Sequence, residues 1–308
     1  MEYVEGLVSV ITPTYKRSDM LKRAIDSVLS QTYSDIELII VNDNERNDEY
    51  SEKLYSLLEQ YSDPRLKFLE QAKHINGAVA RNFGIKNAQG EFIAFLDDDD
   101  WWEPNKIELQ VEEFKKLDDR WGVVSCLKKY YKDGKFYRAS LPYKDGNVFE
   151  GVITITKNIT TGTAMIRHCA LDEVGAFDEG LLRQQDVQLF SFLAKEYQFK
   201  LLKKHLHNID ISDNQNRPNA DKIRKIKEAY FKSVTPLLEG NIKLKKRLLQ
   251  HLEFSIGMTY FKQKDIKEFL KTVFPLIVAP KVVLDEIAVY IGNSFEIIFK
   301  DRILGKYK

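Results

Sequence analysis

The chain has 308 residues, of which 44% are hydrophobic and 30% are charged. This length and composition suit one large domain, or a large and a small one, and exclude a disordered chain. The two cysteines, Cys126 and Cys169, are far apart and lack metal-ligand spacing. We therefore expect no disulfide framework, and we expect the protein in a reducing, cytoplasmic compartment.

The apolar runs are too short or too interrupted for a membrane span. Residues 7–11 are apolar but end before Pro13, and the stretch 273–279 contains Pro275 and is flanked by lysines. The acidic start of the chain also differs from the basic start of a secretory leader. We therefore expect neither a signal peptide nor a transmembrane helix.

Strand and helix patterns alternate through the first half of the chain. Strands are predicted at residues 8–11, 37–41, 65–69, 91–96 and 123–127. Helices are predicted after Ser18 (a candidate cap), at residues 50–61 and 77–88, and after Glu103-Pro104. This alternation predicts an α/β fold with a mostly parallel, Rossmann-like sheet flanked by helices. Beyond residue 130 the pattern loosens: residues 154–166 look β-like and 184–197 helical.

Polar clusters follow three of the predicted strands, at residues 12–17, 42–44 and 97–100. Ligands collect at the carboxyl ends of strands in such sheets, so these clusters predict a binding site. The last cluster is four adjacent aspartates, which repel one another unless a cation lies among them. Carboxylate oxygens suit Mg²⁺ or Mn²⁺ bridged to a substrate phosphate. The alternative is a solvated acidic turn, but the run joins a buried strand to Trp101-Trp102.

The sequence resembles the inverting glycosyltransferases of family 2, which have the GT-A fold. The resemblance covers roughly residues 6–200 and depends on motifs that occur in the family's order. These are VSVITPTY at 8–15, SQT at 30–32, ELIIVND at 37–43, NG at 76–77, ARNFG at 80–84, GEFIAFLDDDD at 90–100, VGAFDE at 174–179 and QD at 185–186. It implies transfer of a sugar from a nucleotide diphosphate, by family habit a UDP-sugar.

The resemblance implies a role for each donor-site residue. Pro13 and Tyr15 would line the base pocket, Arg17 would assist at base or phosphate, and Asp43 would bond to base or ribose. Arg81 and Asn82 would lie along the donor. Asp97 and Asp99 would bind Mn²⁺ or Mg²⁺, with Asp97 also at the ribose, Asp98 near the nucleotide, and Asp100 supporting the next helix. The alternatives are packing for Tyr15, an Asx-turn for Asp43, and an exposed helix face for Arg81 and Asn82.

Asp186 is the expected catalytic base, because an acceptor hydroxyl needs a carboxylate to take its proton. Helix capping is the alternative role and is compatible with catalysis. The family usually has Glu-Asp here, so Gln185 leaves the proton transfer to Asp186 alone. Residues 160–163 would line the acceptor or sugar pocket, and His205 or His207 are candidate ligands of the metal or diphosphate. A catalytically inactive, nucleotide-binding partner subunit is the alternative function.

The last part of the chain is helical in pattern and basic. Residues 221–308 hold 18 Lys and Arg against 10 Asp and Glu, whereas residues 1–220 hold 29 against 36. The loop at 214–219 suggests a catalytic domain at 1–217 and a helical region at 218–308. The basic segment 243–247 and the later lysine-flanked apolar stretches predict peripheral contact with the inner face of the membrane, suited to a glycan or lipid-linked acceptor. Packing on the catalytic domain or a homodimer contact is the alternative, and no nucleic-acid motif is present.

Overall fold

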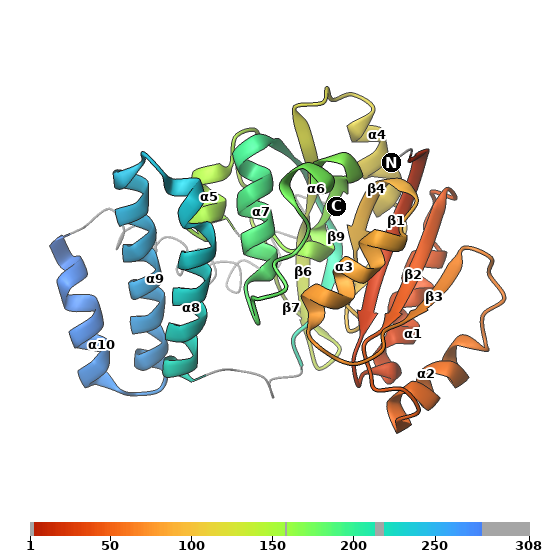
Figure 1. Ribbon diagram of the computed structural model, residues 1–308, viewed down its shortest axis with the longest axis horizontal. Coiled ribbons are helices and arrows are strands. Elements are labelled where there is room, and N and C mark those ends of the chain that lie inside the picture. Colours follow the sequence, from red (N-terminus) through yellow and green to blue (C-terminus); the bar gives the residue numbers. More distant parts are fainter. Residues whose placement is uncertain (1–2, 158, 213–218, 279–308) are drawn as a thin grey trace.

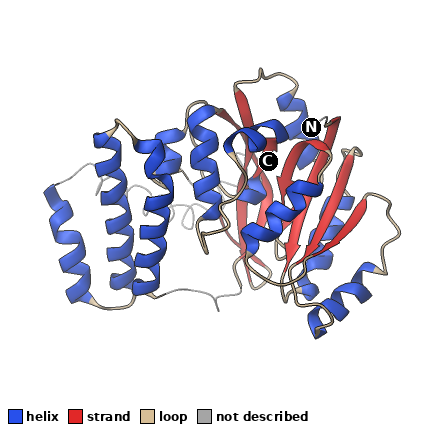
Figure 2. Ribbon diagram, viewed as in Figure 1, coloured by secondary structure: helices blue, strands red, loops and turns tan. Residues whose placement is uncertain are grey.

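The computed structural model describes residues 3–157, 159–212 and 219–278. Within these ranges, nine strands form one mixed sheet flanked by helices, and the C-terminal helices stand beside it (Figures 1 and 2). The strands are β1 (Val4–Thr14), β2 (Ile36–Asn42), β3 (Leu66–Glu70), β4 (Gly90–Phe95), β5 (Trp101–Trp102), β6 (Trp121–Lys132), β7 (Lys135–Ala139), β8 (Ala164–Arg167) and β9 (Gln198–Asp210). The helices are α1 (Ser18–Leu29), α2 (Glu49–Leu58), α3 (Gly77–Asn87), α4 (Lys106–Phe114), α5 (Phe149–Ile153), α6 (His168–Val174), α7 (Gln185–Glu196), α8 (Ala220–Val234), α9 (Ile242–Lys262) and α10 (Ile266–Val273).

The predicted α/β class is confirmed, and the first four predicted strands form one parallel block. Their order is β3-β2-β1-β4, with Ile11 of β1 opposite Ile39 of β2 and Phe95 of β4. The alternating side chains of β1 separate two cores. Val8 and Val10 pack in the cluster that contains the apolar residues of α1, whereas Ile11 packs in the cluster that contains α3. Both faces of the sheet are therefore covered, as a parallel sheet requires.

The second half of the sheet is less regular than predicted. Only the end of the β-like stretch 154–166 is in a strand, β8, which lies between β4 and β6 and is antiparallel to both. Beyond it, β9 runs parallel to β6. Ser18 is the first residue of α1 and not its cap, a position held by Arg17.

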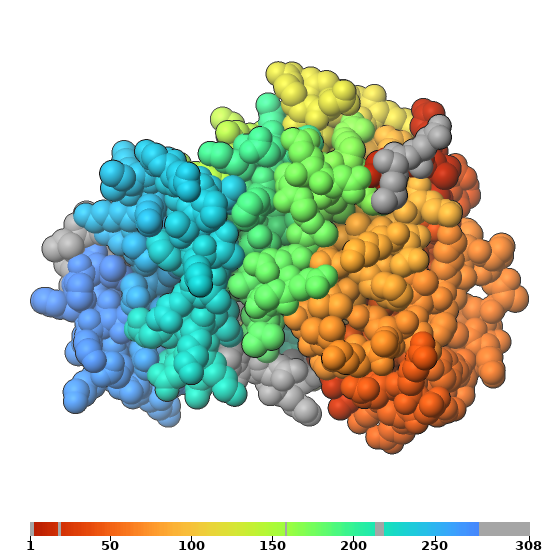
Figure 3. Space-filling model, viewed as in Figure 1, coloured from red at the N-terminus to blue at the C-terminus, as the bar shows by residue number. Residues whose placement is uncertain are grey.

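The C-terminal helices pack directly on the α/β part. Ile153 of α5 joins an apolar cluster of residues from α8, α9 and the turn between them: Tyr230, Val234, Leu238, Leu244, Leu248 and Leu252. The Tyr230 hydroxyl donates a hydrogen bond to the carbonyl of Ile153 at 2.8 Å. In the space-filling view α8 lies against the segment that contains α7 (Figure 3). The predicted boundary loop lies mostly outside the described residues, so the division at 217/218 stays a prediction. No helix of the described part is long and apolar enough to cross a bilayer.

Candidate active site

Two cavities adjoin at the carboxyl ends of β1, β2 and β4. The first has a volume of about 690 Å³ and the second about 450 Å³. Arg81 and Asp97 line both cavities. The first is also lined by Pro13, Thr14, Tyr15, Lys16, Arg17, Asp43, His74, Gly77, Asp98 and Asp99. The structure therefore brings together the predicted donor residues, with the exception of Asn82.

An aromatic stack forms one side of the first cavity. The ring of Tyr15 lies on that of His74, with centroids 3.9 Å apart and planes 14° apart. His74 Nδ1 lies 2.9 Å from Oδ2 of Asp43, and Gln71 donates a hydrogen bond to the other carboxylate oxygen. Burial raises the pKa of Asp43, although His74 opposes this shift. Tyr15 and Asp43 thus share one partner, His74, which no sequence pattern indicated.

The four adjacent aspartates differ in their nearest partners. Asp97 pairs with Arg81, whose Nη2 lies 2.5 Å from Oδ1, and Asp99 pairs with Arg17. Asp98 is buried and accepts a hydrogen bond from the Thr14 hydroxyl at 2.9 Å. The two arginines pair with carboxylates that face the cavity. A diphosphate bound there would also attract the two guanidinium groups.

The sequence analysis expected Asp100 to support the following helix, but the structure places its carboxylate elsewhere. Its carboxylate lies 2.9 Å from Nε2 of His207 and accepts a hydrogen bond from the backbone N–H of Asp210, both on β9. Nε2 of His205 lies 3.0 Å from the carbonyl oxygen of Ser140. Burial, with the nearby Lys106 and Lys128, lowers the pKa of His207 to about 3, so its ring is neutral. Asp100 therefore ties the aspartate run to β9.

The crowding of carboxylates changes how readily they ionise. Burial and Asp99 raise the pKa of Asp98 to about 7, and burial with Asp100 and Asp97 raises that of Asp99 to about 7. Burial also opposes ionisation of Asp97, but Arg81 outweighs it and lowers the pKa of that carboxyl. The surroundings therefore do not fully neutralise the negative charge that complete ionisation of the run would create.

The residues present fit a hard divalent cation. Asp97 and Asp99 both line the first cavity and offer only oxygen atoms, which Mg²⁺ and Mn²⁺ prefer. In the part of the chain that the structure describes, no three His, Cys, Asp or Glu side chains are gathered as a metal cage. Two carboxylates completed by substrate phosphate and water are the usual arrangement for such ions.

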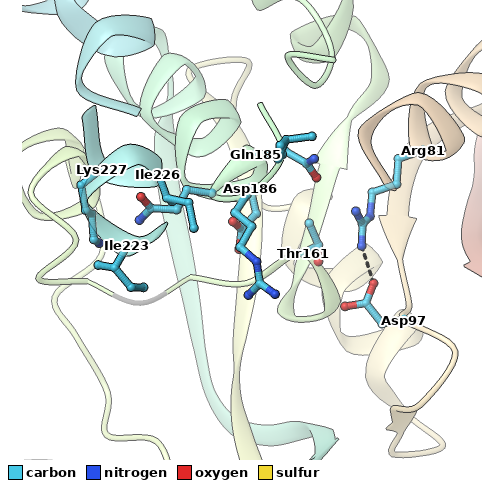
Figure 4. Close-up of a pocket in the computed structure, with 11 residues that line it drawn as sticks. Arg81, Asp97, Thr161, Gln185, Asp186, Ile223, Ile226 and Lys227 are labelled. Atoms are coloured by element: carbon cyan, nitrogen blue, oxygen red, sulfur yellow. Dashed lines mark hydrogen bonds and ion pairs between the residues drawn. The ribbon is translucent and has the colours of Figure 1, made fainter. Parts of the chain in front are cut away.

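The second cavity contains Asp186, in the first turn of α7 (Figure 4). Thr161, Arg81 and Asp97 lie on one side of it, and α8 lies on the other. Burial raises the pKa of Asp186. Gln184, immediately before α7, has a left-handed backbone with φ 62°, a conformation that is uncommon for non-glycine residues. Gln185 is buried and donates to the carbonyl of Leu181, so it supports the turn that presents Asp186.

Asn82 lines neither cavity. Its side-chain nitrogen donates to the carbonyl of Phe177 and to Glu179, and its oxygen accepts from the N–H of Phe177 at 3.0 Å. Its predicted contact with the donor stays a prediction, and the observed bonds join α3 to the loop before Asp186.

The Asn82→Ala substitution is expected to lower the free energy of unfolding by about 2–3 kcal/mol. It leaves the buried N–H and carbonyl of Phe177 without partners, and each unsatisfied group costs about 1–3 kcal/mol. Urea unfolding measures this loss. The matched control is Asn87→Ala at the exposed end of the same helix, which should cost less than about 0.5 kcal/mol. Equal costs would contradict the bracing role.

Comparison with known proteins identifies the family. The family model described as "Glycosyl transferase family 2" matches residues 9–175, which is more than half of the chain. The chain belongs to glycosyl transferase family 2. The matched region contains the complete first cavity, and Asp186 lies 11 residues beyond it.

Curated relatives of this family 2 chain are bacterial glycosyltransferases. An uncharacterized glycosyltransferase of Rickettsia typhi is 32% identical over 193 residues, which is 61% of this chain and 58% of the relative. The putative colanic acid biosynthesis glycosyl transferase WcaA of Escherichia coli is 30% identical over 193 residues, or 62% of this chain and 67% of the relative. The Escherichia coli UDP-Glc:alpha-D-GlcNAc-diphosphoundecaprenol beta-1,3-glucosyltransferase WfgD is 41% identical over 110 residues, or 36% of this chain and 42% of the relative. The chain thus spans under three fifths of the R. typhi relative's length.

Solved structures confirm the GT-A fold. S. aureus TarS 1–349 in complex with UDP-GlcNAc has a TM-score of 0.60 at 18% identity and covers 87% of this chain and 73% of that one. Mannosyltransferase PcManGT from Pyrobaculum calidifontis, in complex with GDP-Man and Mn²⁺, has a TM-score of 0.55 at 16% identity. It covers 96% of this chain and 87% of that one. Both likenesses extend beyond the matched family region into the C-terminal helices.

Proposed function

We propose that this protein is an inverting, metal-dependent glycosyltransferase that moves a sugar from a UDP-sugar to a hydroxyl of a glycan or lipid-linked acceptor. One observation carries the proposal: the cavity with the paired aspartates adjoins the cavity with Asp186, and Arg81 and Asp97 belong to both. A donor in the first cavity would therefore present its sugar towards Asp186. The name of WfgD, with a UDP-sugar donor and a lipid-diphosphate acceptor, supports both substrate classes.

In this mechanism the first cavity holds the donor. Tyr15 stacks on the base beside Pro13, Asp43 accepts hydrogen bonds from base or ribose, and Asp98 fixes the loop that begins at Thr14. Arg17 and Arg81 exchange their aspartate partners for the diphosphate oxygens. Asp97 and Asp99 would hold Mn²⁺ or Mg²⁺, which offsets the negative charge on the departing diphosphate.

The second cavity supplies the base. Asp186 accepts the proton of the acceptor hydroxyl as its oxygen bonds to the anomeric carbon. The bond from that carbon to the diphosphate oxygen breaks on the opposite side, which inverts the configuration. Burial raises the pKa of Asp186, which makes its carboxylate a stronger base than an ordinary aspartate.

Nucleotide release from a panel of UDP-, GDP- and TDP-sugars with Mn²⁺ tests the proposal. Release from one donor, dependent on metal and lost in Asp99→Ala, is the expected result and names the donor. Intact nucleotide binding without turnover, with a broad panel of acceptors present, favours the alternative of an inactive partner subunit.

Peripheral membrane contact is proposed through the basic segment 243–247 and through α10. In that segment Leu244 is buried and Arg247 pairs with Glu150, whereas Lys243, Lys245 and Lys246 are exposed. The side chains of Ile266 and Leu270 on α10, and of Phe274 directly after it, are 49%, 54% and 70% exposed, next to Lys267 and Lys271. Exposed apolar residues flanked by lysines suit an anionic bilayer surface.

Sedimentation with anionic phosphatidylglycerol vesicles checks this contact. The wild type should sediment at physiological salt, and Leu270→Ser with Phe274→Ser should stay in the supernatant, because apolar insertion supplies much of the affinity. Leu249→Ser, an exposed apolar residue on α9, is the matched control. Loss of a dimer in the double variant, measured by light scattering, would instead support the predicted homodimer contact.

A further inference from the structure

His74 lies in the loop between β3 and α3 and lines the first cavity. Its ring stacks on the ring of Tyr15, with centroids 3.9 Å apart, and its Nδ1 lies 2.9 Å from Oδ2 of Asp43. Tyr15 and Asp43 are the residues that bind the nucleotide base in the proposed function. An ionised carboxylate only accepts hydrogen bonds, so the Nδ1 of His74 carries the hydrogen. The imidazole therefore combines a flat aromatic face with a ring N–H, as a uracil ring does.

We propose that the His74 ring occupies the place of the nucleotide base, so that a donor binds only by displacing this ring from Tyr15 and Asp43. His74 is then an internal competitor that regulates how tightly the site holds a nucleotide. The inference rests on the proposed function, because it takes the first cavity as the donor site and Tyr15 and Asp43 as the residues that bind the base.

The burial of Asp43 makes His74 and a base alternative partners. The Asp43 side chain is only 4% exposed, and Gln71 donates a hydrogen bond to its other oxygen at 3.1 Å. A base therefore reaches this carboxylate only when a neighbouring group moves aside. The His74 side chain is 32% exposed and lines the cavity, so it is the partner of Asp43 on the cavity side.

The loop allows His74 to move without disturbing the helix that follows. Lys73 and Ile75 on either side of it are exposed, and none of the three lies in a helix or strand. The side-chain oxygen of Asn76 caps α3, and its side-chain nitrogen donates a hydrogen bond to the carbonyl of Glu179 at 2.9 Å. Because the chain is held at Asn76, rotation of the His74 side chain is the movement that opens the base site.

The contact between His74 and Asp43 also has an energetic reason. A buried carboxylate without a partner is costly, and His74 supplies the partner that a bound base would otherwise supply. The same contact lowers the apparent affinity for every ligand that has a base, in proportion to the fraction of molecules in which the site is open. A site closed in about nine of ten molecules would bind UDP about tenfold more weakly than an open one. Inorganic diphosphate, which has no base, is not affected.

Calorimetry with these two probes tests the inference. UDP and inorganic diphosphate are each titrated, with Mg²⁺, into the wild type and His74→Ala. The variant should bind UDP about three- to tenfold more tightly than the wild type does, and diphosphate with unchanged affinity. His74→Phe keeps the stacking and His74→Asn keeps an N–H, so each should give a smaller gain. Ile75→Ala removes an exposed side chain that does not line the cavity, and as the matched control it should change neither affinity.

The histidine ring signals in NMR spectra of the wild type give a second readout. The signals of His74 are those missing from His74→Ala, or from His74→Asn if the alanine variant unfolds. Stacking on Tyr15 shifts these signals upfield. UDP with Mg²⁺ should move them to the positions of a solvent-exposed histidine, whereas diphosphate should leave them in place.

Weaker UDP binding by His74→Ala, or His74 signals that stay upfield with UDP bound, would overturn the inference and show that the ring stacks on the base. Loss of affinity for both probes would overturn it in favour of a role in the fold of the site. Nucleotide release from the donor panel is measured in the same samples. The expected binding pattern without turnover would contradict the transferase function alone, whereas turnover with unchanged UDP affinity in His74→Ala would contradict the inference alone. UDP that bound to neither protein would contradict the donor site and the inference together.

Discussion

The Asp186→Asn variant is expected to lose about 10²–10⁴-fold in kcat, the range that general-base catalysis supplies. Asparagine keeps the size of the side chain and the first turn of α7 but cannot accept the acceptor's proton. Affinity for UDP should stay within about twofold, because Asp186 lines the second cavity and not the first. Steady-state nucleotide release and UDP calorimetry measure the two quantities.

The control for this variant is Glu196→Gln, an exposed carboxylate at the other end of α7, which should retain full activity. The pH profile gives a second readout. Because the base acts when deprotonated and its pKa is raised, kcat should fall with decreasing pH already above the ordinary range of an aspartate. A kcat for Asp186→Asn within threefold of wild type would remove Asp186 from the mechanism.

The Asp99→Asn variant is expected to change nucleotide affinity in opposite directions with and without metal. With Mn²⁺, UDP binding should weaken by about 100-fold or more, since even the loss of a residue that only supports a metal ligand costs about 10–100-fold. Without metal, UDP should bind several-fold more tightly than to wild type. The Asp99 carboxylate lines the cavity proposed for the diphosphate, and its removal also breaks its ion pair with Arg17.

Calorimetry of UDP with Mn²⁺ and with EDTA measures both effects of Asp99→Asn. Asp133→Asn, in the exposed turn after β6, is the matched change of charge and should alter neither affinity. A uniform loss in both conditions would indicate that Asp99 supports the fold of the loop and does not bind the cation.

The parallel half of the sheet was predictable because its strands are buried on both faces. Such strands appear in the sequence as short apolar runs, and the helices between them carry the 3.6-residue period. The four-residue strand β8 was not predictable as an antiparallel insertion. Its pairing with β4 and β6 is set by contacts between residues far apart in the chain, and four residues are too few to show a period.

The residues of the site also fall into those that the sequence predicted and those that it did not. The aspartate run was predicted because it combines carboxylate chemistry with a position at the end of a strand, and Asp186 because residues 185–186 resemble the family's Glu-Asp motif. His74 was missed because a histidine in a loop has no local pattern, and its partners Tyr15 and Asp43 come from two other loops. Asp100 was misassigned because its partners on β9 lie more than 100 residues away. The residues of α8 that line the second cavity could not be predicted either, because their position there depends on how the C-terminal helices pack on the α/β part.

The ion pair between Arg81 and Asp97 has a consequence for substrate binding. Both residues belong to the wall that the two cavities share. A ligand that binds Arg81 from one cavity therefore changes the lining of the other cavity. In the proposed mechanism UDP would draw this arginine towards its diphosphate and so alter the neighbouring cavity. Binding of one substrate should then change the affinity for the other, by the same factor in both directions.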